Sequence, residues 1–307
     1  MRRALGILIV VALASVTPPA RACPCRASFG PGGSLTSSVQ TWGASLIEAA
    51  QFVHGYWDAE GDYVPIQGFQ RRLDVFATTA YRALPALELS LGTVFGTETR
   101  VAPGGLNANR TGFGDTLLRA RWEAHESPVP HRRSWLNPGV ALIGSIRAPT
   151  ASDTTESNAG SRGSTLGDGL STWEAAIAVD LSHALHDDWR IGVLLEGALR
   201  APDESFGVSR WLGPRLTAQG TLGHSLFRSL ELGVLAGIEW EADTTVAGNV
   251  VSATGRRAID VGAFASFVPP NSPVRSGVQL RHSPLIDGFG VNAVATTQFG
   301  VSLGYVH

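Results

Sequence analysis

Acidic and basic residues recur at alternate positions within several apolar stretches of this 307-residue chain. In residues 172–200, Glu174 and Asp180 share one parity, and Arg190 and Glu196 share one parity after a short turn. Carboxylates and guanidinium groups gathered on one surface can attract or screen small charged solutes. They can also pair with one another and fill a narrow space. The chemistry that these residues predict is either a polar pathway or a packed ionic interior.

Eight charged residues are our candidates for the lining of such a pathway, and they comprise four of each sign: Glu88, Arg119, Arg121, Glu174, Arg190, Glu196, Arg215 and Glu231. Side chains fill small β-barrels, whereas only wide barrels leave a broad channel. Two interpretations follow: a narrow or gated pathway, and a barrel closed by ion pairs.

The alternation that brings these charges onto one face is typical of long β-strands. From Trp173 to Leu181 every second residue is apolar, because successive side chains of a strand point to opposite faces. Alternating segments of about ten residues indicate a membrane β-barrel rather than a soluble sandwich with shorter strands. Twelve such segments are expected, at 38–54, 68–82, 86–98, 112–124, 135–147, 171–184, 188–200, 208–223, 227–241, 257–268, 273–283 and 292–306. The predicted fold class is all-β, a single transmembrane antiparallel barrel.

The connections between these segments alternate in length. Those at 83–85, 185–187, 224–226 and 269–271 are short, whereas the longest, at about 148–170, has no apolar periodicity. Short periplasmic turns and long outer loops produce this asymmetry in bacterial barrels. With an even number of strands, both termini are expected in the periplasm. One connection, at 126–134, is long for a periplasmic turn.

The N-terminus has the features of an export signal. Arg2 and Arg3 precede a short apolar run, and a small-residue cleavage site ends at Ala22. The expected organisation is a signal peptide at 1–22, a short periplasmic segment at 23–37 and the barrel at 38–307. Cleavage after Ala22 would leave Cys23 first and open to lipidation, although Arg21 replaces the small residue of lipoprotein signals. No later run is long enough for a transmembrane helix.

Composition excludes several other functions. Charged residues make up only 16% of the chain, and neither a basic stripe nor a recognition motif for nucleic acid is present. No cofactor motif is found either. The expected partners are outer-membrane lipid, lipopolysaccharide and a small-molecule permeant, and the oligomeric state is left open.

The alternation of apolar and polar residues is clearest in one segment and weakest in another. In 230–240, Leu232, Val234 and Ala236 share one face, which we expect to contact lipid. In 38–54, Glu48 falls on the apolar face, so either a bulge re-aims it or part of this segment lies outside the wall. Aromatic residues near strand ends are typical of the girdles at membrane interfaces: Trp42, Trp122, Trp173, Trp189, Trp240 and Tyr305.

Two local motifs carry a resemblance to a known family. The sequence Gly112-Phe113-Gly114-Asp115-Thr116, and Ala148-Pro149-Thr150-Ala151 with the later Thr172-Trp173, are similar to motifs of the outer-membrane β-barrel proteins named for the MetA-pathway of phenol degradation. The specific matches cover roughly 110–180. Ala151 stands where the family has Gly, and the chain ends in His307 rather than the usual aromatic. The resemblance implies a channel or transport protein for small, often hydrophobic, compounds.

Other functions remain as alternatives. Cys23 and Cys25 flank one proline, and together with histidines near the periplasmic rim they are weak candidates for a metal site. An outer-membrane hydrolase would need a nucleophile and a base at the outer rim, where only His54 and His282 are expected. We therefore predict a non-enzymatic passive channel. The alternative is a structural or surface-interaction barrel without a conducting pore.

Overall fold

The computed structural model of the chain describes residues 40–101, 107–125, 138–151, 172–186, 188–205, 208–227, 229–269 and 272–307. The expected signal peptide (1–22), the segment 23–37 with Cys23 and Cys25, the connection at 126–134 and most of the connection at 148–170 lie outside the described residues. Every element that is described is a β-strand. No helix in this part of the chain is long and apolar enough to span a membrane.

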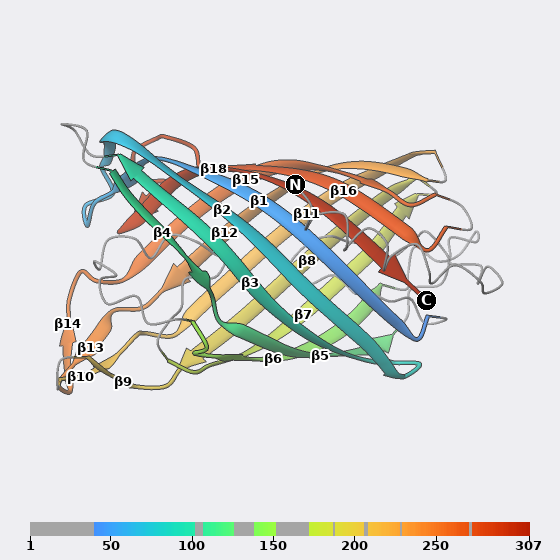
Figure 1. Cartoon of the computed structure of the whole chain (residues 1–307), viewed down its shortest axis with the longest axis horizontal. Coiled ribbons are helices and arrows are strands. Elements are labelled where there is room, and N and C mark those ends of the chain that lie inside the picture. Colours follow the sequence, from blue (N-terminus) through green and yellow to red (C-terminus); the bar gives the residue numbers. More distant parts are fainter. Residues whose placement is uncertain are drawn as a thin grey trace, which may run out of the picture.

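Twelve strands pair antiparallel in chain order and close into one barrel, which confirms the predicted fold class. In Figure 1 the near strands tilt one way and the far strands the other, as in a barrel of tilted strands. The wall consists of β1 (Trp42–Trp57), β2 (Tyr63–Leu84), β3 (Leu87–Val101), β4 (Asn107–Phe113) continued by β5 (Thr116–His125), β6 (Gly139–Ala148), β7 (Glu174–His186), β8 (Trp189–Arg200), β11 (Arg215–Phe227), β12 (Leu230–Glu241), β15 (Arg256–Phe267), β16 (Val274–His282) and β18 (Ala293–Val306).

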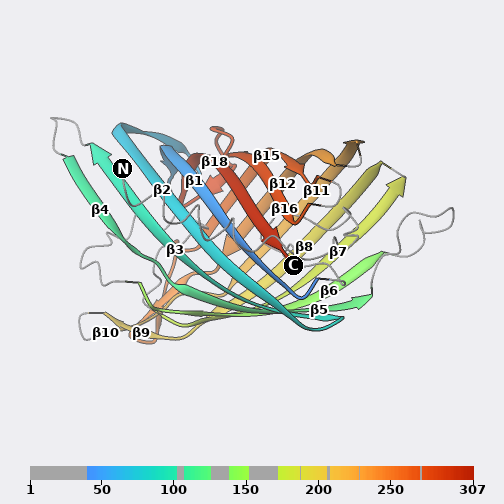
Figure 2. The same cartoon turned by 45° about the vertical axis from the view of Figure 1, so that its right-hand side comes forward.

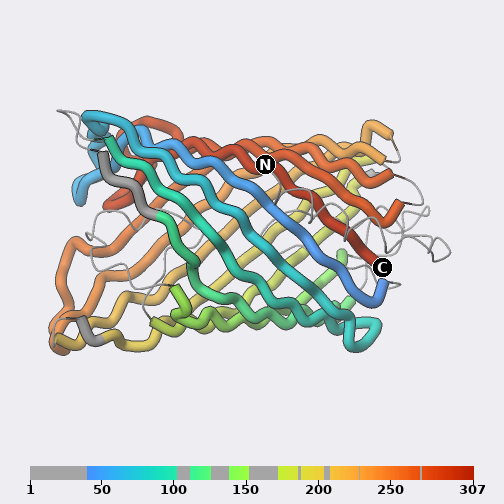
Figure 3. The backbone as a smooth tube through the Cα atoms, in the orientation of Figure 1, coloured from blue at the N-terminus to red at the C-terminus, as the bar shows by residue number. Residues whose placement is uncertain are grey.

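The first and last strands close the barrel. β1 pairs with β18 from Gly43 opposite Val306 to Trp57 opposite Ala293, and the two strands run side by side in blue and red in Figure 3. Because β1 and β18 also pair with β2 and β16, the main chain of both strands finds partners on either side and the wall is closed at this seam. A closed barrel is one of the few structures that satisfy their backbone in hydrocarbon.

The two ends of the barrel differ in structure. At the end near the C-terminus, β2 and β3 are joined by a two-residue turn at Pro85 and Ala86. At the opposite end the connections of β8 to β11 and of β12 to β15 form a second, four-stranded sheet (Figures 1 and 2). Its strands are β9 (Asp203–Ser205), β10 (Val208–Trp211), β13 (Thr244–Val246) and β14 (Asn249–Val251), while β17 (Gly290–Val291) pairs with β15. We call these ends the turn side and the loop side.

The predicted strand at 208–223 is wrong at both ends. Residues 208–211 form β10 of the small sheet, and the wall strand β11 begins at Arg215. Pro214 has no amide hydrogen to continue a ladder, and Gly213 lies so close to the backbone of Ala242 that no side chain would fit there. The predicted turn at 224–226 is wrong too, because a bulge between Ser225 and Phe227 carries β11 further.

The predicted strand at 112–124 is also interrupted, at Gly114 and Asp115. The Asp115 carboxylate is buried and accepts a hydrogen bond from the amide of Ala151 at 3.2 Å. Thr150 donates its hydroxyl to the carbonyl of Gly114 at 3.3 Å. The two motifs that carry the family resemblance therefore contact each other, and they hold the end of β6 against the break between β4 and β5.

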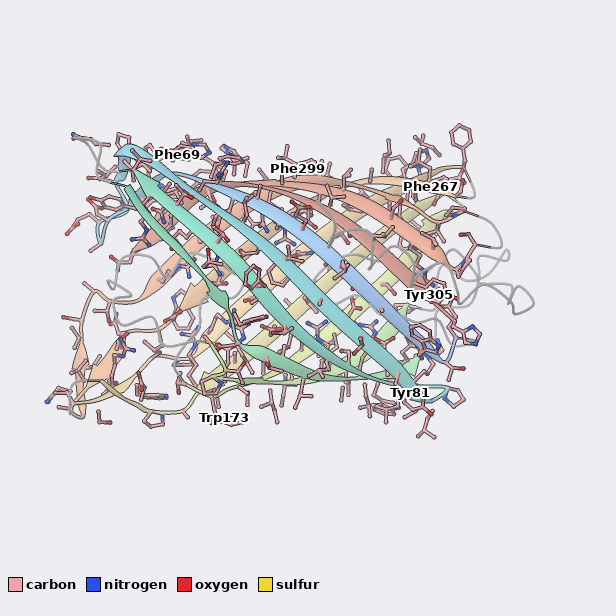
Figure 4. All side chains as sticks on the ribbon, in the orientation of Figure 1. Phe69, Tyr81, Trp173, Phe267, Phe299 and Tyr305 are labelled. Atoms are coloured by element: carbon pink, nitrogen blue, oxygen red, sulfur yellow. The ribbon has the colours of Figure 1, made fainter. Side chains whose placement is uncertain are left out.

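Apolar side chains cover the outside of the wall. Ile177 is 72% exposed and Val234 is 55% exposed, which for large apolar residues indicates a surface that lipid covers. In Figure 4, Phe69 and Trp173 project near the loop side, and Tyr81, Phe267 and Tyr305 project near the turn side. These aromatic residues lie where girdles meet the two membrane interfaces.

Glu48 is an exception on this apolar face. β1 is wall along its whole length, and its bulge lies between Val53 and Gly55, so neither explanation expected for Glu48 applies. Glu48 is exposed on the outer face, opposite Val75 on β2 and Val301 on β18.

Candidate functional site: the charged interior

Charged side chains occupy the inner face of the wall. On β12, Val234 and Trp240 are about half exposed on the outside, whereas Glu239 and Glu241 are each 7% exposed. On β7, Ile177 is likewise exposed and Glu174 is buried. Because alternate residues of one strand point to opposite faces, the buried acids point into the barrel. The interior is thus where the protein concentrates its charge.

A first group of ion pairs lies near the turn side, and we call it the turn-side cluster. It consists of Arg82, Glu88, Arg121, Glu123 and Asp180. Arg82 contacts Glu123 at 3.2 Å and Glu88 at 3.7 Å, and also donates to the carbonyl of Pro85. Arg121 reaches Asp180 at 2.7 Å and Glu123 at 3.8 Å. These contacts join β2, β3, β5 and β7 along one part of the inner face.

A second group, the loop-side cluster, lies near the small sheet. Its members are Arg147, Glu174, Glu196, Arg200, Arg215, Glu239, Glu241 and Arg256. Glu174 is its centre: one carboxylate oxygen accepts from Arg215 at 2.9 Å and the other from Arg200 at 2.9 Å. Arg147 approaches the same carboxylate at 3.8 Å.

The loop-side cluster extends around the wall from this centre. Arg215 also pairs with Glu196 at 3.0 Å, and Arg200 pairs with Glu241 at 2.8 Å. Arg256 pairs with Glu239 at 3.0 Å. The contacts connect β6, β7, β8, β11, β12 and β15, so each charge has a partner on another strand.

Pairing of this kind is needed because most of these groups are buried. The side chains of Arg82 and Glu88 are each 3% exposed, and that of Glu174 is 4% exposed. An isolated charge in such surroundings is strongly unfavourable, and its partner offsets the lost hydration. Removing one partner would leave the other charge uncompensated.

Other inner charges keep contact with open space. Arg190 is 33% exposed, Glu231 is 20% exposed, and their closest atoms are 3.9 Å apart. Asp260 is 30% exposed and lies 3.5 Å from Arg281, which also donates to Gln219 at 2.9 Å. Parts of the interior are therefore lined by charges that solvent can reach.

The eight candidate residues from the sequence fall into three groups. Glu88 and Arg121 belong to the turn-side cluster, and Glu174, Glu196 and Arg215 belong to the loop-side cluster. Arg190 and Glu231 form the more accessible pair. Arg119 shares the inner face of β5 but makes no ion pair or hydrogen bond with a described residue.

Several members of the clusters were not among those candidates. Arg82, Arg147, Arg200 and Arg256 sit at or near strand ends, but each has the inward parity of its strand. That parity was the available signal. Asp74, only 1% exposed and paired with Arg72 at 2.8 Å, gave less signal because β2 has a mixed pattern.

His54 and His282, the base candidates expected at the outer rim, lie together at one hydroxyl. Within the described residues, no three His, Cys, Asp or Glu side chains are grouped so that they could hold a metal ion. His54 and His282 both contact the hydroxyl of Thr297, at 2.7 and 2.9 Å. No described carboxylate hydrogen-bonds to either ring, so the group lacks the acid that orients the base in catalytic triads.

Comparisons with known proteins bear on the fold. No family model matches the sequence, and no curated protein matches it. Among solved structures, the chain is similar to an outer-membrane channel from Pseudomonas putida F1, with 13% identity and a TM-score of 0.70 over 91% of this chain and 99% of that one. The transport unit of the autotransporter AIDA-I from Escherichia coli matches with 8% identity and a TM-score of 0.48, over 89% of this chain and 92% of that one. The match to the Pseudomonas channel shows that the chain has the fold of an outer-membrane barrel.

Proposed function

We propose that the protein is a passive outer-membrane channel for small molecules. The observation that carries this proposal is the unequal exposure of the inner charges: Arg190, Glu231 and Asp260 stay accessible inside a closed barrel with an apolar exterior. Arg190 and Glu231 are the second residues of β8 and β12, at the turn-side mouth, whereas Asp260 lies further inside on β15, where a barrel packed completely shut would bury it. A polar route with buried ion pairs along its wall accounts for both the exposed and the buried inner charges.

The topology that goes with this function has the turn side in the periplasm. Both termini then lie there, after removal of the signal peptide at 1–22, and the small sheet of β9, β10, β13 and β14 faces outward. Lipid and lipopolysaccharide contact the apolar face. We also propose that the protein is a member of the family named for the MetA-pathway of phenol degradation. The hydrogen bond between Ala151 and Asp115 supports this membership, because it joins the two motifs that resemble that family. The permeant class of that family, small and often hydrophobic compounds, belongs to the same proposal.

The eight candidate residues act in different ways in this channel. The paired members of the two clusters fix the shape of the wall. Arg190, Glu231 and the unpaired Arg119 face the route itself and set the local potential that a permeant crosses.

A barrel without a conducting pore is the second candidate function. The extent of the two clusters favours it, since ion pairs join strands two apart in the wall, β5 with β7 and β7 with β11, and their side chains occupy part of the interior. In that case the small sheet on the loop side would be the functional surface.

Conductance of the refolded protein in a planar bilayer separates the two functions. A channel gives stepwise currents, and changing Glu231 to Ala shifts the cation-to-anion preference. A non-conducting barrel stays silent even though the protein is folded and inserted. Ester cleavage by a silent barrel would instead support an enzyme, and changing Thr297 to Ala would abolish that cleavage.

A further inference from the structure

Arg119 differs from the other inward-facing arginines whose side chains the structure describes. Each of the others has an ion pair or a hydrogen bond to a described residue, whereas Arg119 has neither. Its Nε atom is buried without a partner, a feature that it shares with Arg121 and Arg215. The side chain remains partly exposed on the inner face. An arginine that is mostly buried and unpaired is unfavourable unless water or an anion satisfies it.

The inner surface around Arg119 is made of small residues. Directly opposite it lie Ser90 on β3 and Ser145 on β6. The same row continues through small residues on both sides: Ala80 and Gly43 beyond Ser90, and Ala176 and Ala198 beyond Ser145. Residues directly opposite one another lie about 5 Å apart at Cβ. Arg119 is therefore flanked in its row by short side chains on both sides.

In the next row of the inner face, the equivalent arginine already has an ion-pair partner. Arg121, two residues along the same strand, lies between Glu88 and the larger Ile143, and it is already bound to Asp180. The acids that act on Arg119 over longer distances, Glu196 and Glu88, are engaged with Arg215 and Arg82. Neither acid is free to move to Arg119 without breaking an existing pair.

We propose that Arg119, with Ser90 and Ser145 on either side, is a binding subsite for the carboxylate group of a small organic anion. A guanidinium group presents parallel N–H donors that match the two oxygens of a carboxylate, and hydroxyl groups on both sides add donors. The inference rests on the proposed function insofar as the anion reaches the subsite along the channel.

Binding of acetate to the folded barrel in detergent tests the subsite without requiring conduction. Saturation-transfer NMR should detect acetate on the wild type, and Arg119→Gln should weaken that binding about tenfold, the loss expected of a charged hydrogen-bonded contact. Arg119→Lys should weaken acetate binding too, because the charge remains but the parallel N–H donors of the guanidinium group are lost. The matched control is Arg257→Gln, which removes an arginine charge from the outer face of β15, opposite Trp240, and should leave acetate binding unchanged.

Other results would contradict the subsite or the channel. Equal acetate binding by the wild type and Arg119→Gln would overturn the subsite, as would binding of inorganic phosphate in place of acetate. In planar bilayers the acetate-to-chloride permeability ratio should fall in Arg119→Gln and stay unchanged in Arg257→Gln. A wild type that binds acetate through Arg119 but never conducts would overturn the channel and leave the subsite standing.

Discussion

The outer and inner faces of this barrel are built by the same strands with opposite chemistry. On β12, Val234 is largely exposed on the outside while Glu239, five residues further along, is buried inside. A soluble protein of this composition would bury the valine and expose the acid. The inversion indicates that the surroundings outside the wall are apolar and that the charged face is within.

The comparison also explains why the two faces are stabilised differently. Outside, each residue contributes by its own transfer into lipid, so neighbouring positions are nearly independent. Inside, the charges of the two clusters depend on one another, because a partner offsets the burial of each. A substitution should therefore have local effects on the outer face and shared effects on the inner face.

The largest effect is expected when a shared partner is removed. Arg121→Ala should lower the free energy of unfolding by about 3–5 kcal/mol, because Asp180 and Glu123 lose a buried counter-charge. Arg119→Ala is the matched control, on the same strand and face but unpaired, and should cost much less. Urea unfolding of both variants in lipid vesicles measures the difference, and equal losses would mean that the cluster does not act as a unit.

A charge placed on the outer face should have the next largest effect. Val234→Arg should destabilise the inserted barrel by about 2–4 kcal/mol if the residue lies near the middle of the bilayer. Gln279→Arg, on the inner face of β16, is the control. Gly233 is unsuitable for this purpose, because a side chain there would collide with the ring of Phe264. The heat-resistant folded band on gels reports the loss, and similar loss at both positions would contradict the assignment of faces.

Glu48 tests the same difference between the faces by removing a charge from the outer face. Glu48→Leu should stabilise the barrel by about 1 kcal/mol, because it removes a carboxylate from the lipid face. The gain is modest since a carboxylate costs somewhat less there than an arginine. Ser45→Leu, on the inner face of the same strand, should bring no such gain. The free energy of unfolding in vesicles measures both, and a large loss in Glu48→Leu would show that the carboxylate has a partner on the outer face.

The smallest effect on stability is expected at the accessible inner pair. Glu231→Ala should change the free energy of unfolding by less than about 1 kcal/mol, since its contact with Arg190 is long and partly solvated. Its ion selectivity should nevertheless shift toward anions in a planar bilayer. A large loss of stability without any conductance would favour the barrel that is packed shut.

Most of the wall could be predicted from the sequence because period-two alternation is a local property. The small sheet could not, since β9, β13 and β14 have three residues each, too few for a period to be recognised. The break at Gly114 depends on Thr150, which lies far away in the sequence. Local patterns do not contain that contact.

The candidate site was predictable to a similar extent. Parity alone places Glu174 and Arg215 on the inner face, but it does not say that they meet. Contacts across several strands depend on register and on the curvature of the closed wall. For the same reason, the lack of a partner for Arg119 could not be predicted from its position on β5.

The central claim is that lipid covers one face of each strand and water reaches the other. With Cys23 and Cys25 changed to Ser, a fluorophore attached to Val234→Cys or to Glu231→Cys reports its surroundings on the same strand. The account predicts that the label at 234 is quenched by brominated lipid and not by iodide, and that the label at 231 is quenched by iodide and not by brominated lipid. Quenching of both labels by iodide alone, in a folded and inserted barrel, would contradict it.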